Sequence, residues 1–278
     1  NQTDFDIVLQ EDAQLLNEVV VVGYGTQKKG NLTGAIASIK SDEILTTTHS
    51  SLAQNLQGKV AGLQIRQQSG EPGSFDNMIS IRGFGTPLYV IDGIPRDGSG
   101  EFQRLNPTDI ESISILKDAS AAIYGLNAAN GVILVTTKKG QKGKPRFNYS
   151  GVFGWQKPTD VPEMMNAGQF MDIKNEASIN AGGEPILTKE ELMKWKEGAP
   201  GYESTDWYDE AMKGSAFQQQ HNFSVTGGSE NVDFFFSLGY LTDNGIVKND
   251  GFDYEKYTFR SNLSAKLSKH LTAEVLPQ

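Results

Sequence analysis

The chain has 278 residues, 37% of them hydrophobic and 9% aromatic, with 30 glycines, no cysteine and a formal net charge of −9. The acidic balance argues against a nucleic-acid-binding protein, because neutralising phosphates needs a dense Lys/Arg surface, and without cysteine no disulfide or thiolate chemistry is available. No run of about 18 apolar residues occurs, which excludes a transmembrane helix but leaves room for the shorter, alternating strands of a transmembrane β-barrel.

The N-terminal segment, NQTDFDIVLQED, predicts one short strand from Phe5 to Leu9. No partner strand is visible beside it, so we interpret residues 1–14 as the C-terminal end of an upstream β-sandwich-like domain. The segment has neither a basic region nor an apolar run, which indicates that a signal peptide has been removed or that the chain is an internal piece of a longer protein.

Residues 16–34 read LNEVVVVGYGTQKKGNLTG and place four valines before Gly-Tyr-Gly. A dinucleotide-binding turn needs G-x-G-x-x-G between a strand and a helix. Gly23 and Gly25 fit that pattern, but Lys28 occupies the third glycine position and no helical periodicity follows. The valines are therefore a strand buried in the protein or a strand that another protein binds, within a linker at residues 15–30.

Residues 31–144 interleave short strands with short helices, which predicts a compact α+β domain. The expected strands are Ala35–Lys40, Leu63–Gln68, Met78–Arg82, Leu88–Ile91, Ser112–Leu116 and Val132–Thr137. The expected helices are Ser51–Leu56 and Asp118–Tyr124, the second with Asp118 as its N-cap and Gly125 as its stop.

Residues 145–278 change to long two-residue alternation, as in Phe147, Tyr149, Gly151, Phe153 and Trp155. Strands that are apolar on one face and polar on the other fit a half-exposed soluble sheet or a lipid-facing barrel wall. The short connections GGSEN and SKH contrast with a long insertion between Gln156 and Ala216 that contains the helical segment TKEELMKWKEG. Short turns at one end and long loops at the other favour the barrel.

No constellation for catalysis or metal binding is apparent. The three histidines, His49, His221 and His270, are far apart, which leaves zinc and triad sites unsupported. Asp92 in YVIDG is interpreted as a turn residue before Gly93 rather than a catalytic acid. We therefore expect no enzyme activity, no metal and no cofactor.

With this layout, the chain resembles the plug region and first barrel strands of a SusC-like (SusC/RagA) TonB-dependent outer-membrane transporter. The resemblance rests on NEVVVVGYGTQKK, LAQNLQGKVAGLQI, ISIRGFG, PLYVIDGIP, NPTDIESISILKDASAAIYG, AANGVILVTTKKG, TDWYDEAM, HNFSVTGGSE and GYLTDNGIVKN, in the family's order. It implies a plug domain at 31–144 inside a transmembrane antiparallel barrel of about 22 strands, with the first strands and first long extracellular loop at 145–278. The 278 − 144 = 134 residues after Lys144 cannot supply about 22 strands of 9–11 residues, so a fragment is expected.

The resemblance further implies active import of a large nutrient across the outer membrane of a Gram-negative bacterium. The substrate would be an oligosaccharide or other glycan, with peptide as a further possibility. The implied partners are TonB with its inner-membrane energising complex, a SusD-like surface lipoprotein that lids the barrel, and outer-membrane lipid, with no nucleic acid.

The resemblance also assigns candidate residues. Glu18, Val19, Val20, Val21 and Val22 match the TonB box, where an extended segment would pair with TonB by strand addition. Arg82 in ISIRGFG matches a plug arginine that pairs with barrel carboxylates in related transporters. A second such arginine is not matched, since Ser112 follows Glu111, and the Gly85–Pro87 connection is shorter than is usual in the family.

One alternative is a non-transport surface protein that holds glycan against aromatic side chains. Its candidate residues are Trp155, Trp195, Trp207 and Tyr208, of which Trp195, Trp207 and Tyr208 are also the candidate substrate contacts of a transporter. The competing interpretation is that the aromatic side chains of the long loop pack against the plug, the barrel or the lipoprotein.

Overall fold

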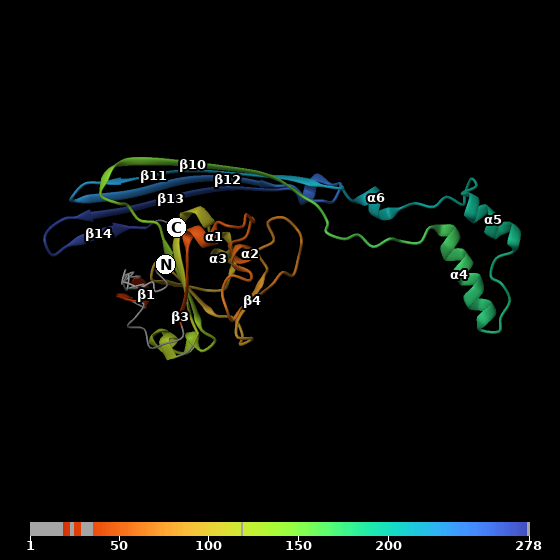
Figure 1. The fold of residues 1–278 in the computed structure, drawn as a ribbon, viewed down its shortest axis with the longest axis horizontal. Helices are drawn as coiled ribbons and strands as arrows, with labels where there is room; N and C mark the ends of the chain where they lie inside the picture. Colours follow the sequence, from red (N-terminus) through yellow and green to blue (C-terminus); the bar gives the residue numbers. More distant parts are fainter. Residues whose placement is uncertain (1–18, 23–24, 29–35, 118, 277–278) are drawn as a thin grey trace, which may run out of the picture. The chain divides into compact units, whose positions relative to one another are not determined.

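The computed structural model describes residues 19–22, 25–28, 36–117 and 119–276 (Figure 1). The predicted upstream strand, residues 1–14 and Glu18 lie outside the described residues. The chain divides into two compact units. The first comprises the described residues up to Ser69 together with Phe75–Lys139, and the second comprises Gly70–Ser74 together with the described residues from Gly140 onward.

A five-stranded sheet organises the first unit. Its strand order is β3 (Ile36–Lys40), β8 (Ile110–Leu116), β9 (Val132–Thr137), β6 (Leu88–Ile91) and β7 (Ile94–Arg96). β6 and β9 pair in parallel, whereas the other neighbours pair antiparallel. The central strand β9 has the sequence VILVTT and is buried along most of its length, as expected for a strand covered on both faces.

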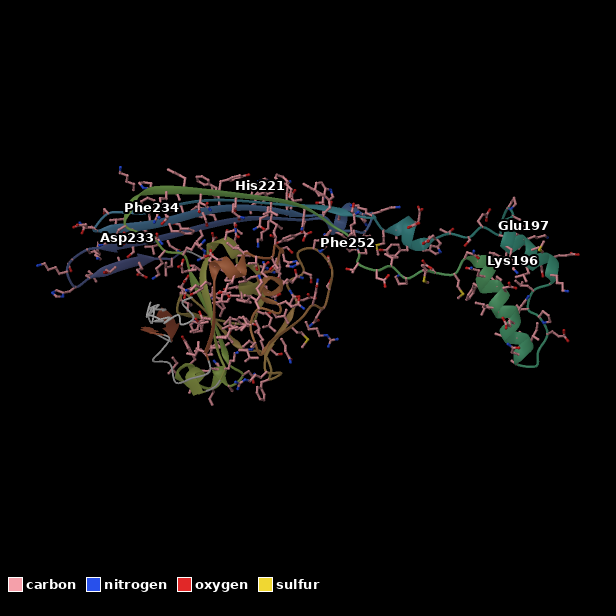
Figure 2. The ribbon with its side chains drawn as sticks, viewed as in Figure 1. Lys196, Glu197, His221, Asp233, Phe234 and Phe252 are labelled. Carbon is pink, nitrogen blue, oxygen red and sulfur yellow. The ribbon has the colours of Figure 1, made fainter. Side chains whose placement is uncertain are left out.

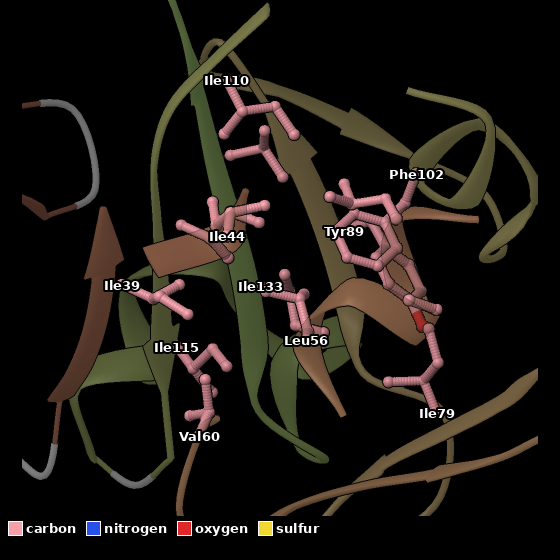
Figure 3. Packing of buried hydrophobic residues seen from close by; sticks show 14 of the residues in the cluster. Ile39, Ile44, Leu56, Val60, Ile79, Tyr89, Phe102, Ile110, Ile115 and Ile133 are labelled. Carbon is pink, nitrogen blue, oxygen red and sulfur yellow. The ribbon is translucent and has the colours of Figure 1, made fainter. Parts of the chain in front are cut away.

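The main core lies between one face of this sheet and a layer of short elements (Figure 3). That layer consists of α1 (Ser41–Ile44), α2 (Leu52–Leu56), α3 (Gly100–Arg104) and the antiparallel hairpin of β4 (Leu63–Arg66) and β5 (Met78–Ile81). Ile79 and Ile81 of the hairpin are buried, while Gln64 and Arg66 are exposed. Two-residue alternation therefore places one face of the hairpin on the core and leaves the other face open.

The opposite face of the sheet packs against two 3₁₀ helices, η3 (Ala119–Tyr124) and η4 (Leu126–Ala128). The α-helix predicted for Asp118–Tyr124 is therefore wrong in type over its described residues. 3₁₀ turns are frequent as connectors, although runs longer than about 3–4 residues are uncommon; here the segment joins β8 to β9, and Ala121 packs against the sheet. A further 3₁₀ turn, η2 (Pro107–Asp109), is capped by Asn106.

The second unit contains a five-stranded antiparallel sheet in chain order. Its strands are β10 (Gly143–Gln156), β11 (Ala216–Gly228), β12 (Val232–Asp243), β13 (Tyr254–Lys266) and β14 (Thr272–Val275), with η5 (Asp250–Phe252) before β13. Cross-strand pairs such as Tyr149↔Phe223 and Leu238↔Phe259 align the large apolar side chains on one face. His221, labelled in Figure 2, lies among them with its Nδ1 2.8 Å from Tyr149 Oη. The predicted alternation is present in the structure.

The long insertion between β10 and β11 carries α4 (Ala167–Asn180), α5 (Lys189–Glu197) and α6 (Trp207–Ala211). Capping boxes start α4 at Asn166 and α5 at Thr188, which satisfies backbone N–H groups that the helix leaves unpaired. Lys196 of α5 forms an ion pair with Asp172 of α4 at 2.5 Å. Among the helices in the described part of the chain, none is long and apolar enough to cross a membrane.

Candidate functional site

Three places hold the residues that the sequence singled out: the valine strand, the turn at Arg82 and the aromatic residues of the long insertion. The valine strand is β1 (Val19–Val22), which forms an antiparallel hairpin with β2 (Gly25–Lys28). Its register pairs Val19 with Lys28 and Val22 with Gly25. Among the described residues this sheet has two strands, so β2 is hydrogen-bonded to one edge of β1 and no described strand is hydrogen-bonded to the other.

Arg82 lies in a tight turn at the end of β5. Its φ is 54° and that of Gly83 is 78°, and Ile81 and Phe84 bridge across the turn, with the Phe84 N–H donating to the Ile81 carbonyl at 3.1 Å. Two consecutive positive φ values are the pattern of a type I′ turn. An arginine pays a steric cost in this region, and a 2.8 Å bond from the Arg82 N–H to the Gly62 carbonyl helps to hold it there.

The open face of the β4–β5 hairpin forms one wall of a cleft of about 490 Å³. The loop after Arg82 lines a second wall with Phe84, whose side chain is 61% exposed. Arg66 and Asp76 add opposite charges to the lining. The cleft therefore combines an exposed aromatic ring with charged and amide groups, which is a chemistry suited to a polar ligand with apolar patches.

A buried polar network supports this cleft from beneath. Asn77 is 3% exposed and its Nδ2 donates to Gln103 Oε1 at 2.7 Å, while Gln103 Nε2 donates to Ser99 Oγ at 2.9 Å. Asn77 Oδ1 and the Tyr89 hydroxyl are buried without a hydrogen-bond partner among the described residues. Burial raises the pKa of Tyr89 far above its ordinary value, so the hydroxyl stays protonated. This network could not be predicted from the sequence, because Asn77 and Gln103 are 26 residues apart.

The structure brings together only two of the three candidate aromatic residues of the insertion. Trp207 and Tyr208 start α6 and line one groove. Trp195 is on α5 and does not line that groove. Its ring and that of Tyr202 pack in a T-shaped arrangement, with centroids 5.1 Å apart. The indole therefore has a packing role within the insertion.

Asp92 is a structural turn residue, as predicted. It has a φ of 49°, is followed by Gly93 at 86°, and joins β6 to β7. Its carboxylate accepts hydrogen bonds from the Thr137 N–H at 2.8 Å and the Thr137 hydroxyl at 2.7 Å. Within the described ranges, no group of three metal-ligating side chains comes together.

The fold and its sequence both match known proteins. Residues 28–132 match the TonB-dependent Receptor Plug Domain family. A TonB-dependent receptor of Formosa agariphila is 38% identical over 97% of this chain and 27% of its own length. The TonB-dependent receptor SusC of Bacteroides thetaiotaomicron is 35% identical over 93% of this chain and 25% of its own length. The chain thus spans about a quarter of the length of these relatives.

Among solved structures, the RagAB peptide importer in its open-open state superimposes with a TM-score of 0.77. The match has 26% identity and covers 92% of this chain and 31% of that one. These features define a class of protein: an α+β plug domain followed by the first antiparallel strands of a barrel. The expected fold class is confirmed. The chain belongs to the SusC-like TonB-dependent receptors.

Proposed function

We propose that the protein containing this chain imports a large nutrient across the outer membrane of a Gram-negative bacterium, with TonB as the source of work. The nutrient is an oligosaccharide, with peptide as the alternative, and a SusD-like lipoprotein covers the barrel. The family supports the oligosaccharide, whereas the likeness to the RagAB peptide importer supports the peptide. Residues 15–30 act as the TonB box and linker, 31–144 as the plug and 145–278 as the first part of the barrel.

The observation that carries this proposal is a short valine strand just before the plug that, among the described residues, pairs with β2 alone. TonB adds its own strand to the segment Glu18–Val22, and main-chain hydrogen bonds supply the affinity. The hairpin partner β2 holds only one edge of β1. TonB replaces β2 on the edge to which Val20, paired with Gln27, directs its backbone N–H.

The plug contributes two further elements to import. Arg82 pairs with a carboxylate of the barrel and is released when the plug is remodelled. The cleft on the β4–β5 hairpin meets the incoming nutrient, with Phe84 as the apolar contact and Arg66 with Asp76 as polar contacts. The short connection from Gly85 to Pro87 keeps the rim of the cleft low, because few residues are available to cover it.

Binding of the TonB C-terminal domain to a peptide spanning Leu15–Lys29 tests the proposal. The wild-type peptide is expected to bind, and Val20→Pro is expected to abolish binding, because proline removes a backbone donor from the strand. Gln27→Pro is the matched control, since Gln27 is paired with Val20 in the hairpin. That change opens the hairpin but leaves β1 intact, so binding is expected to persist or strengthen.

Absence of binding by the wild-type peptide, or binding that ignores Val20→Pro, would refute the role of the strand. A loss of binding with Gln27→Pro equal to that with Val20→Pro would show that TonB recognises the hairpin and not a single strand. Fractionation of cells that express the full-length protein, followed by uptake measurements with and without TonB, tests location and import separately.

A further inference from the structure

The groove that contains Trp207 and Tyr208 has a volume of about 690 Å³. It lies between the segment before α4 and the segment that carries α6. Met164, Met165 and Trp207 line it and are 77%, 54% and 74% exposed. Large apolar side chains that remain exposed in one cluster mark an interaction surface.

Hydrogen bonds donated by backbone N–H groups hold the two segments that form the groove. The Ala167 N–H donates to Ser204 Oγ at 2.9 Å and joins the two segments. On the α6 side, the Lys213 N–H donates to the Ile246 carbonyl at 2.6 Å, and the Lys248 N–H donates to the Ala211 carbonyl at 2.8 Å. These bonds hold the end of α6 on the connection between β12 and β13, so the groove exists before any ligand arrives.

Three of the polar side chains that line the groove, Asn166, Ser204 and Asp206, already accept hydrogen bonds from backbone N–H groups at the starts of α4 and α6. Asn166 Oδ1 accepts from the Gln169 N–H at 2.8 Å. Asp206 Oδ1 accepts from the N–H groups of Tyr208 and Asp209 at 2.9 and 3.2 Å, and Ser204 Oγ is used by Ala167. Sugar recognition needs directional polar groups beside an aromatic ring, and these capping atoms are committed elsewhere. The surface that the groove offers is mainly methionine and tryptophan.

Acidic side chains are concentrated on the two segments that form the groove. The exposed carboxylates of segments 157–166 and 203–213 belong to Asp160, Glu163, Glu203, Asp206, Asp209 and Glu210. Three lysines lie on or beside these segments: Lys157, Lys213 and Lys248, and the Lys248 ammonium group donates to the Asp209 carbonyl. The pKa of Glu203 is lowered by backbone hydrogen bonds, of which the bond from the Gly201 N–H has the largest effect, so this carboxylate remains charged in mild acid. These acidic side chains therefore attract cations and repel anionic lipid headgroups.

Three observations point to a partner: the apolar lining, the polar atoms already hydrogen-bonded within the chain, and the acidic side chains nearby. From them we infer that this groove docks a segment of another protein that presents an apolar side chain flanked by lysine or arginine. Trp207 is expected to contribute most of the binding energy, because tryptophan is common among the residues that dominate protein interfaces. The methionines adapt to the shape of the inserted side chain. This docking site is separate from the proposed import function and does not depend on it.

The test uses full-length receptor in detergent micelles with ¹³C-methyl-labelled methionine, with Met164, Met165 and Met212 assigned by single Met→Leu substitutions. The probe is the capped peptide Gly-Lys-Leu-Phe-Lys-Gly. It is expected to shift these three methyl signals, and its affinity is expected to fall when salt is raised, because exposed charges are screened. Replacing both lysines of the peptide by glutamate, or Leu-Phe by Ser-Ser, is expected to remove the shifts.

Two receptor variants and one control locate the binding. Trp207→Ala is expected to weaken the peptide at least about tenfold. Met164→Gln, at a position exposed enough to tolerate the change, is expected to weaken it by a smaller factor. Met193→Gln, at a position on α5 that is 55% exposed and outside the groove, is expected to leave binding unchanged. Equal binding of the glutamate peptide, indifference to both groove variants, or methyl shifts with a linear gluco-hexaose but not with the peptide would overturn the inference.

Discussion

Arg82 is a residue whose backbone conformation and expected function are in tension. A φ of 54° disfavours arginine, whereas asparagine and glycine accept it. A non-glycine residue held in this region costs on the order of 1 kcal/mol, and such strain concentrates at functional positions. The side chain is thus retained where the turn alone would select another residue.

The first prediction concerns Arg82→Asn. We expect the free energy of unfolding of the plug to rise by about 0.5–1 kcal/mol, because asparagine tolerates a positive φ, while nutrient uptake by the full-length receptor falls. Chemical unfolding of the isolated plug and uptake in cells are the two measurements. Arg82→Lys keeps the charge and the strain, so its stability should match wild type. Normal uptake by the Arg82→Asn receptor would show that import does not require the Arg82 side chain.

Sequence reasoning succeeded at residues whose neighbours carry the signal. Asp92 precedes a glycine between two apolar runs, and the Asp-Gly pair is a common type I′ turn. The positive φ of Arg82 was not foreseen, because arginine rarely occupies such a turn. The cleft residues Asn77 and Gln103 were also missed, since their contact depends on how the β4–β5 hairpin and α3 pack and no local pattern reports it.

At the level of elements, α5 is held at its start by a titratable cap. The Thr188 backbone N–H, followed by the Thr188 hydroxyl, donates to the Glu191 carboxylate and lowers the pKa of Glu191 below its ordinary value of 4.5, with Lys194 contributing in the same direction. A carboxyl group whose pKa is lower in the folded state stabilises the fold above its unfolded pKa. That stabilisation is lost as the pH falls through the folded value.

The second prediction is that the N-terminal turn of α5 opens in acid. Amide hydrogen exchange of Glu191 and Leu192 should show constant protection factors near neutral pH and a decline as the pH falls below 4.5, the ordinary pKa of this carboxyl group, and through its lower folded pKa. Glu191→Gln is the control, because glutamine can still close the capping box but does not titrate. Identical pH profiles for the two proteins would assign the decline to another group.

Element prediction from sequence depended on strand length and apolar pattern. β6 and β9 were predicted with their observed bounds, because each is a short apolar run next to a turn signal. β7 (Ile94–Arg96) was missed, since it has three residues and one of them is proline. α3 was missed because GEFQR begins with glycine and has too few residues to show helical periodicity. Both β7 and α3 are stabilised by tertiary packing and not by a local sequence pattern.

For the molecule as a whole, each of the two core clusters of the plug is built from residues of the first unit alone. Ile133 is fully buried, whereas Ile94 on the edge strand β7 is 46% exposed. A domain of this size with a contained core is expected to unfold cooperatively with a free energy of roughly 5–15 kcal/mol.

The third prediction is that purified residues 31–144 fold without the barrel strands and give a single urea transition by fluorescence and circular dichroism. Ile133→Ala should destabilise this fragment by about 2–5 kcal/mol, because it leaves a cavity. Ile94→Ala, the matched exposed site, should cost less than about 1 kcal/mol. A fragment that shows no transition, or similar losses for the two variants, would mean that the plug needs the rest of the chain to form its core.

The position of β3 in the plug sheet decides the order in which a pulling force does its work. β3 is the first strand of that sheet after the β1–β2 hairpin and lies at the edge of the sheet, where β8 is its one bonded neighbour among the described strands. Tension applied at Val19 would first unzip the hairpin, then reach Ile36 at the start of β3. Only after β3 has come away would the load pass to strands that are bonded on both sides. An edge strand of the sheet thus lies next to the point of attachment, and its release would leave the parallel pair β6 and β9 intact.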